Sequence, residues 1–432
     1  MLIEFSVGNY LSFKETVTLS MVATNVTAKN KSVDENNVFH VDEELSLLKS
    51  AAVYGANASG KSNLIEAMGF MRWFVLNSSK ETQIEDAINV QEFKLSTETD
   101  GKPSLFEIVF ILEDKLYRYG FEVDEKQVVS EWLYYVPQVR ESKLFERNKN
   151  GIKMTKVFKE GELISDKTRN NALFLSVNAQ FNGKISTSIF RWFIDLNIIS
   201  GLHSKFYEKV TVEYFEDSEY KNEIIQLIRK WDLGIDDIKI NTKDVLLEED
   251  SFRENSIIYS EEFRRFMFDA GVPTDEIQTL HKKYDSKGKI VSEVVFDFEE
   301  NESEGTKKLF AFAVPILDTL RNGEILIIDE LDARLHPIIT RAIIELFNSK
   351  QTNPHNAQLI FTTHDTNLLS NKIFRRDQIW FTEKNRQGAT DLYSLVQYKV
   401  RNDASFESDY IKGRYGAIPF LGDLTELFEK NG

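Results

Sequence analysis

The chain has 432 residues, contains no cysteine and carries a formal net charge of −16. The length allows two or three domain-sized units, and the lack of cysteine excludes disulfides, thiol catalysis and Cys-ligated zinc. The acidity argues against broad electrostatic binding of nucleic acid. Neither a bilayer-spanning apolar run nor a signal peptide is found in the sequence, so we expect a cytoplasmic protein without a membrane partner.

The first 60 residues predict a nucleotide site. Residues 1–20 alternate between apolar and polar side chains, which predicts two strands with a turn at Gly8-Asn9. A short apolar strand at 51–54 then leads into Gly55-Ala-Asn-Ala-Ser-Gly-Lys-Ser62, a match to the phosphate-binding loop GxxxxGK[ST]. Small residues let backbone N–H groups approach phosphates, and the helix that follows directs its positive end toward them.

The loop assigns roles to single residues. We expect Lys61 to reach the β- and γ-phosphates of ATP and Ser62 to bind Mg²⁺. The further nucleotide contacts that we predict in and beside the loop are Gly55, Asn57, Ser59, Gly60 and Asn63.

The middle of the chain changes character twice. Residues 105–158 show strand patterns separated by polar turns, which predicts an antiparallel sheet added to the nucleotide core. Helical spacing of apolar residues follows, for example at Ile224, Ile225 and Trp231. It predicts a mostly helical insertion over 201–285.

The last third predicts alternating strands and helices, as in a parallel α/β core. We therefore expect an α/β P-loop fold with a mixed sheet, an added antiparallel lobe and the helical insertion. The predicted units are 1–200, the N-terminal part of an ATPase head with its β-rich lobe; 201–285, the insertion; and 286–432, the C-terminal part of the head.

Asp329 and Glu330 follow four apolar residues, which places them at the carboxyl end of a central strand, where ligands bind in open α/β sheets. We expect Asp329 to hold Mg²⁺ through water and Glu330 to act on the attacking water. His364 ends another predicted strand and is a candidate for sensing the γ-phosphate. The plain alternatives, a surface acidic pair and a structural histidine, are less favoured beside a P-loop.

Ser303-Glu-Gly-Thr306 begins a predicted helix just before the acidic strand. Alone it reads equally well as a helix cap, but its position favours Ser303 and Gly305 as phosphate contacts through free N–H groups. Asp332 follows the acidic pair and is a candidate for a contact across a dimer interface.

The order of these motifs resembles the ABC-type ATPase head of transporters, SMC-like proteins and OLD-like ATPases. The SEGT sequence, and DELDARLHP at 329–337, resemble the stand-alone OLD-like group of bacterial defence ATPases. The opening Asn9–Phe13 and the closing Lys412–Pro419 are similar to RloA and to abortive-infection AbiL-type ATPase subunits, and the PARIS ATPase is similar. The resemblance covers nearly the full chain and is weakest over 200–275.

This resemblance implies a homodimer of heads, or a higher oligomer, in which ATP on Lys61 and Ser62 of one subunit meets Ser303 and Gly305 of another. It implies a separate effector, often a TOPRIM-type nuclease, and a trigger such as DNA or a phage product. ABC heads also use a glutamine as a Mg²⁺ contact, for which Gln91 is the candidate here.

Two further hypotheses stay open. An SMC-like DNA-binding clamp ATPase in DNA repair predicts tight, salt-sensitive DNA binding, although the acidity and the lack of heptads count against it. A transporter nucleotide-binding subunit predicts a membrane partner, although SEGT departs from the transporter motif LSGGQ.

Overall fold

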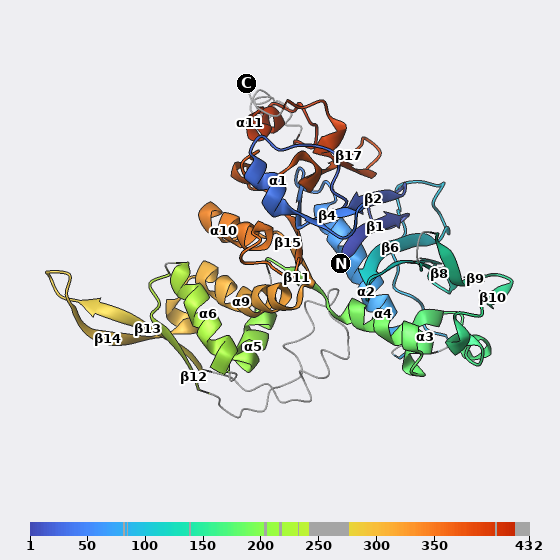
Figure 1. The fold of residues 1–432 in the computed structure, drawn as a ribbon, viewed down its shortest axis with the longest axis horizontal. Helices are drawn as coiled ribbons and strands as arrows, with labels where there is room; N and C mark the ends of the chain where they lie inside the picture. Colours follow the sequence, from blue (N-terminus) through green and yellow to red (C-terminus); the bar gives the residue numbers. More distant parts are fainter. Residues whose placement is uncertain are drawn as a thin grey trace, which may run out of the picture.

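The computed structural model describes residues 1–80, 83, 85–137, 140–202, 205–215, 218–231, 233–241, 276–401 and 404–419. These residues form an α/β core with a β-rich lobe on one side and a helical region with a projecting hairpin on the other (Figure 1). Residues 242–275 of the predicted helical insertion lie outside the described residues.

The β-rich lobe is an antiparallel sheet of seven strands among the described residues, in the order β10-β9-β8-β7-β6-β1-β2. Alternating burial, as along β6, shows one face on the core. The sheet confirms the strands predicted at 1–20 and 105–158. The strands are β1 (Leu2–Gly8), β2 (Val17–Ser20), β6 (Ser104–Leu112), β7 (Lys115–Val123), β8 (Val128–Val136), β9 (Ser142–Asn148) and β10 (Gly151–Met154).

The nucleotide core is a second sheet, with the order β11-β15-β16-β5-β17-β18 among the described strands. Its first five strands pair in parallel, as expected, and β18 is antiparallel at the edge. The carboxyl ends of the parallel strands therefore reach one edge of the sheet. The strands are β5 (Ser50–Tyr54), β11 (Leu196–Ser200), β15 (Ile325–Asp329), β16 (Gln358–Thr362), β17 (Ile379–Lys384) and β18 (Thr390–Ser394).

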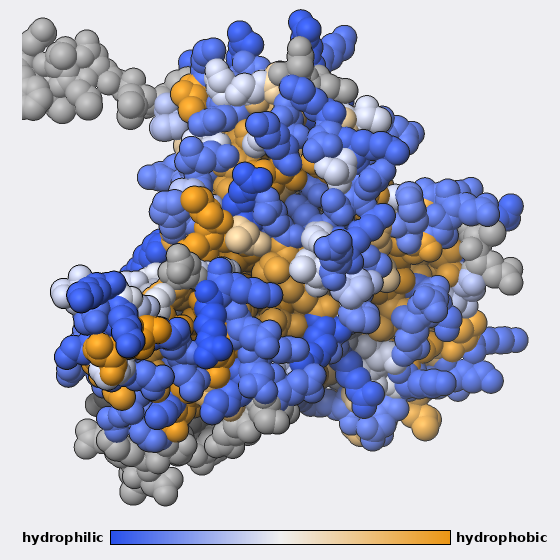
Figure 2. Space-filling view, turned by 60° about the vertical axis from the view of Figure 1, so that its left-hand side comes forward, coloured by the Kyte–Doolittle hydropathy of each residue, from blue (hydrophilic) through white to orange (hydrophobic). Residues whose placement is uncertain are grey.

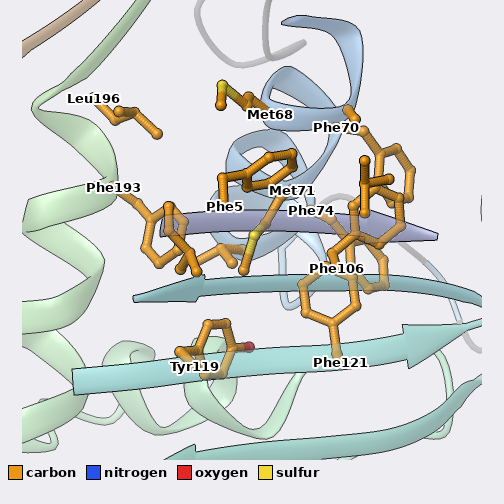
Figure 3. Close-up of a cluster of buried hydrophobic side chains, with 14 of the residues drawn as sticks. Phe5, Met68, Phe70, Met71, Phe74, Phe106, Tyr119, Phe121, Phe193 and Leu196 are labelled. Atoms are coloured by element: carbon orange, nitrogen blue, oxygen red, sulfur yellow. The ribbon is translucent and has the colours of Figure 1, made fainter. Parts of the chain in front are cut away.

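Helix α2 (Lys61–Asn77) joins the two sheets, because it is apolar on nearly all sides and is buried between them. Figure 3 shows its Phe70, Met71 and Phe74 among side chains of β1, β6 and β7, including Phe106 and Phe121. The Phe106 and Phe70 ring centroids lie 4.9 Å apart. The phosphate-binding loop at the start of α2 is therefore anchored in the largest core cluster.

The region from 201 to 285 is only partly helical in the described residues. Helices α5 (Lys205–Tyr214) and α6 (Ser218–Lys230) confirm helical spacing in its first part. Strands β12 (Asp237–Asn241), β13 (Glu276–Tyr284) and β14 (Ile290–Asp297) then form a separate antiparallel sheet. The predicted boundary at 285 falls in the turn of the β13–β14 hairpin, which projects from the body in Figure 1.

Helix α9 (Glu304–Asn322) packs on both α5 and β15, and it confirms the helix predicted to begin at the SEGT segment. Helix α10 (Pro337–Asn348) has a proline at its first position, where proline is tolerated. The other elements are α1 (Lys31–Asn37), β3 (Val38–His40), β4 (Ser46–Leu48), α3 (Phe174–Gln180), α4 (Lys184–Ile194), α8 (Phe298–Asn301) and α11 (Phe406–Ile411).

The face of the molecule in Figure 2 is mostly hydrophilic. In the view of Figure 2, hydrophobic residues show only in patches between charged and polar ones. Among the described residues, no helix combines the length and apolar character that crossing a bilayer would require.

Candidate functional site

The phosphate-binding loop lies between β5 and α2, at the carboxyl edge of the parallel sheet. Lys61 is 5% exposed, and its Nζ donates to the carbonyls of Gly55 at 2.8 Å and Ala56 at 3.1 Å. Burial lowers the pKa of Lys61, while the charges of Asp329 and Glu330 raise it. The Lys61 side chain therefore folds back across its own loop, near Asp329 at the end of β15 and Glu330 just after it.

A hydroxyl network supports the loop from behind. Ser59 Oγ lies 2.7 Å from Thr382 Oγ1 of β17. Thr390 Oγ1 of β18 lies 2.8 Å from both the Ser59 carbonyl and Ser12 Oγ. Asn63 Nδ2 also donates to Ser12 Oγ, at 2.7 Å. Asn63, predicted as a nucleotide contact, thus holds the N-terminal Asn9–Phe13 motif to the start of α2.

Gly60 must be a glycine for two reasons. Its φ of 108° lies where side chains are rarely tolerated. A Cβ there would also come within 2.7 Å of Thr390 Cγ2. The second glycine of the motif is therefore fixed by β18, a strand far away in sequence.

The acidic pair stands at the end of β15, as predicted. Thr362 Oγ1 of the neighbouring β16 donates to Asp329 Oδ1 at 2.6 Å and accepts from the Glu330 N–H at 2.7 Å. Glu330 has a φ of 53°, so the chain turns sharply just after Asp329. We call residues 330–334 the acidic turn.

His364 follows β16 and meets the acidic turn. Its backbone N–H lies 3.3 Å from both carboxylate oxygens of Asp332. Burial and the charge of Lys61 lower the pKa of the His364 imidazole, and the nearby carboxylates raise it. The structure thus brings Lys61, the acidic pair, Asp332 and His364 to one edge of the sheet.

The SEGT segment lies at the start of α9, where Ser303 caps the helix by accepting from the Thr306 N–H at 3.1 Å. Glu304 bonds Arg334 of the acidic turn at 2.7 Å. A Cβ on Gly305 would stand 2.7 Å from the Arg334 carbonyl, so only glycine allows this close approach. Ser303 and Glu304 are exposed to solvent.

A cavity of about 740 Å³ opens beside the phosphate-binding loop, a volume in the range of small-molecule sites. Its described lining joins residues 55–59 with His364, β17 and the C-terminal residues 410–411 and 417–419. Neither the acidic pair nor the SEGT segment lines it.

The C-terminal segment is tied to the core by tyrosine hydroxyls. Tyr393 and Tyr398 both donate to the Tyr415 carbonyl, at 2.8 and 3.0 Å, and Tyr410 donates to the Ala417 carbonyl at 2.9 Å. Gly416 has a φ of 68°, and a Cβ there would meet Glu383. These contacts hold the Lys412–Pro419 motif in place, and its last three residues, 417–419, line the cavity.

Gln91 is not on a strand of the nucleotide core. Its carbonyl accepts from the Leu11 N–H at 2.9 Å and its side chain is exposed. Strand β15 lies between β11 and β16, and on the β11 side Ser200, which is 6% exposed, is in register with Asp329. The sequence could not reveal this, because β11 and β15 are distant along the chain.

Three other residues at the site were missed. The Gly201 N–H donates to the Asp329 carbonyl at 2.6 Å. Glu66 of α2 has a pKa raised by burial and by the charge of Asp329. Lys308 of α9 is buried against the acidic turn. Of these three residues, only Lys308 could have been noticed in the sequence, because it follows SEGT closely. A lysine at that position is more readily interpreted as a solvent-exposed charge.

The donor set suits Mg²⁺ rather than a softer metal. Ser62 and Asp329 offer hydroxyl and carboxylate oxygens, which Mg²⁺ prefers, and both are partly exposed at the sheet edge. Within the described residues no group of three or more His, Cys, Asp or Glu side chains is arranged to hold a metal. One or two protein oxygens that act together with substrate phosphates fit this arrangement.

A family profile described as "AAA domain, putative AbiEii toxin, Type IV TA system" matches residues 50–370. The chain belongs to this AAA family. The match spans the phosphate-binding loop, the acidic pair and His364. The fold class is accordingly that of a P-loop ATPase head, as expected, with a mixed sheet and an added antiparallel lobe.

Among solved structures, the crystal structure of the SmcHead bound to the C-winged helix domain of ScpA is similar at 17% sequence identity and a TM-score of 0.40. The similarity covers 91% of this chain and 97% of that chain. A search of curated proteins finds no match.

Proposed function

We propose that this AAA-family chain is the ATP-binding and hydrolysing subunit of a bacterial antiphage defence system that acts by abortive infection. Two copies dimerise head to tail around ATP and control a separate effector, a TOPRIM-type nuclease. The observation that supports the dimer is that the SEGT segment is open to solvent at the start of α9, where Ser303 is exposed and Gly305 partly exposed. A nucleotide held by a second copy can therefore reach it.

The system class rests on two supports. The family name refers to a toxin of a type IV toxin–antitoxin system. The SEGT sequence resembles the OLD-like defence ATPases, and Asn9–Phe13 and Lys412–Pro419 resemble RloA and AbiL-type ATPases, to which the PARIS ATPase is similar. A trigger such as DNA or a phage product then acts through the paired heads.

Each site residue has a defined task in this proposal. Lys61 and the loop N–H groups bind the β- and γ-phosphates, and Ser62 and Asp329 hold Mg²⁺, which supplies charge neutralisation on the phosphates. Glu330 accepts a proton from the attacking water or orients it. His364 lies beside Lys61 and Asp332 and contacts the γ-phosphate side of the site.

The test is the Glu330→Gln variant. We expect ATP binding to persist, a closed dimer to accumulate with ATP, and turnover to fall by about 100-fold or more, because a positioned general base contributes that much. Turnover is measured as phosphate release and dimerisation by light scattering. Glu345→Gln, on the exposed face of α10, is the matched control and keeps normal turnover. Normal turnover in Glu330→Gln would remove the role of Glu330.

The DNA-clamp alternative is tested by filter binding of the purified chain to duplex DNA at two salt concentrations. A clamp predicts tight binding that weakens steeply with salt. The antiphage proposal predicts weak binding by the ATPase alone, since its net charge is −16, and nuclease activity only when a TOPRIM-type partner is added.

A further inference from the structure

Lys308 makes an unusual set of contacts for a lysine. It lies in the second turn of α9, is 1% exposed, and its Nζ donates to three carbonyls of the acidic turn. These are Glu330 at 3.2 Å, Leu331 at 2.9 Å and Ala333 at 2.8 Å. An ammonium group has three hydrogens, so the carbonyls account for the full donor capacity of the side chain.

The number of contacts separates Lys308 from a lysine that is merely buried. Lys49 is equally buried, and its Nζ donates to the Asn353 carbonyl at the longer distance of 3.3 Å. Burying an ammonium group is costly unless it is well paired. Three converging carbonyls, with the Phe312 ring centroid 5.2 Å from Nζ, meet that requirement at Lys308. The acidic turn is therefore shaped around this charge.

The turn is attached on both sides. Thr362 holds its start to β16 through the Glu330 N–H. On the other side, the Glu304–Arg334 ion pair and the Gly305–Arg334 backbone contact join the first turn of α9 to the far end of the acidic turn. Glu330 and Arg334, at its two ends, both have positive φ values of 53° and 61°. The acidic turn and the start of α9 thus form one body, with Lys308 at its centre.

We propose that Lys308 is a positioning residue that couples the two nucleotide sites of the dimer. This inference rests on the proposed head-to-tail function. Contact of Ser303 and Gly305 with nucleotide on one subunit moves the start of α9. Lys308 carries that movement to the acidic turn of its own chain, which sets Glu330 at the other nucleotide. ATP in one site thereby prepares the catalytic carboxylate of its neighbour.

The experiment uses the full chain with three substitutions of Lys308. Lys308→Arg keeps a charged donor, Lys308→Gln keeps an uncharged donor, and Lys308→Met has neither charge nor donor. Lys307→Met is the matched control, because the adjacent Lys307 donates to Glu299 and Glu304 rather than to the acidic turn. The measurements are kcat, affinity for a non-hydrolysable ATP analogue and melting temperature.

We expect the loss of kcat to be smallest in Lys308→Arg, larger in Lys308→Gln and largest in Lys308→Met. In Lys308→Met the loss should be about 100-fold, because small misplacements of a catalytic group have effects of that size. ATP affinity stays at the wild-type value throughout, and Lys307→Met behaves as wild type. A parallel loss of affinity and melting temperature with kcat would reduce Lys308 to a structural residue and overturn the proposal. If Met does not fold, the Arg–Gln comparison decides on the same criterion.

Mixed dimers of Lys308→Met and Glu330→Gln subunits test the direction of coupling. The one intact Glu330 then lies on the chain without Lys308, and the partner supplies an intact SEGT segment. We expect this dimer to be as slow as the Lys308→Met homodimer. Turnover from one restored site would overturn the proposal, because Lys308 would then act only on the partner's nucleotide. A wild-type chain that neither dimerises nor hydrolyses ATP would instead refute the proposed function itself.

Discussion

The glycines at the start and in the middle of α2 differ in whether a side chain could replace their hydrogen. Gly60 is the N-cap of α2, has a positive φ and stands against Thr390. Gly69 lies in the middle of the same helix, and a Cβ added there would meet no neighbouring group within 4 Å. The sequence motif identifies Gly60 as required, whereas nothing in the sequence distinguishes the environment of Gly69.

Substitution of these two glycines by alanine should therefore have opposite effects. Gly60→Ala introduces strain and a clash with Thr390, so we expect loss of ATP binding, measured by calorimetry. Gly69→Ala removes a flexible residue from a helix interior and should raise the free energy of unfolding by about 0.5–1 kcal/mol. Urea titration measures the second effect. A stabilised Gly60→Ala that still binds ATP would contradict the described geometry of the loop.

Lys308 illustrates what the residue pattern could not show. Burial lowers its pKa from 10.5 to about 8, while Asp332 and Glu330 oppose the shift and Arg334 adds to it. Below pH 8 the ammonium form can serve all three carbonyls, whereas the neutral amine has one hydrogen fewer. A lysine within a charged stretch reads as solvated in sequence, because burial is decided by the fold of the acidic turn.

This titration predicts an alkaline limb in the rate of ATP hydrolysis. Turnover of the wild type should fall as the pH rises through about 8, the pKa of Lys308. Arginine stays protonated in proteins, so in Lys308→Arg the limb should shift to higher pH. The measurement is kcat from about pH 7 to about pH 9.5, which brackets that pKa. The same limb in both proteins would assign it to another group.

At the scale of elements, the parallel strands, their helices and the strand at 290–298, which is β14, were predictable, whereas β12 and β13 were not. Buried strands such as β15 are continuous apolar runs, and α9 and α10 carry clear start signals. The outer half of β13 projects from the body, so no core imposes alternation there. The pairing of Ser200 with Asp329 was not predictable either, because the neighbour of β15 is set by sheet order rather than by sequence spacing. The role of Gln91 as a Mg²⁺ contact stays a prediction.

An acidic cluster where α9 meets β15 predicts a dependence of stability on pH. Burial, with the charges of Asp318 and Asp195, raises the pKa of Glu324 from 4.5 to about 7. The folded state thus binds this proton more tightly than the unfolded state. Its contribution to stability is complete below pH 4.5 and is lost as the pH rises through about 7.

Glu324→Gln removes this titration. We expect its melting temperature to exceed that of the wild type at about pH 8, with a smaller difference at about pH 5. Glu43→Gln, in an exposed loop, provides the control and should leave both values unchanged. An equal difference at the two pH values would show that Glu324 does not carry the effect.

At the scale of the whole molecule, the segment between the two halves of the head has two parts with different roles. Helices α5 and α6 belong to the core, because Thr211 donates to the Ala311 carbonyl and Tyr220 to Asp318, both on α9. The β13–β14 hairpin projects and exposes Tyr284, Ile290 and Val291. The hairpin is therefore the part of this segment that we propose as the surface for a partner or trigger.

Shortening the hairpin tests this division. Replacing residues 284–291 by Asn-Gly joins the paired Lys283 and Ser292 by a two-residue turn, and we expect ATP turnover to remain normal while partner-dependent nuclease activity is lost. Deleting α5 and α6 instead exposes the apolar face of α9 and should prevent folding. Full nuclease control by the shortened chain would exclude the hairpin as the partner surface.

The central position of β5 has a consequence for how the site moves. This strand is buried along its whole length between β16 and β17, so its amides should exchange with deuterium only when the whole core opens. The phosphate-binding loop after β5 and the acidic turn after β15 are not covered by a neighbouring strand on one side. Nucleotide should therefore slow exchange at 55–60 and 330–334 and leave β5 unchanged. Strand β5, at the base of the site, should stay rigid, and only the loop and turn at its edge should respond to the nucleotide.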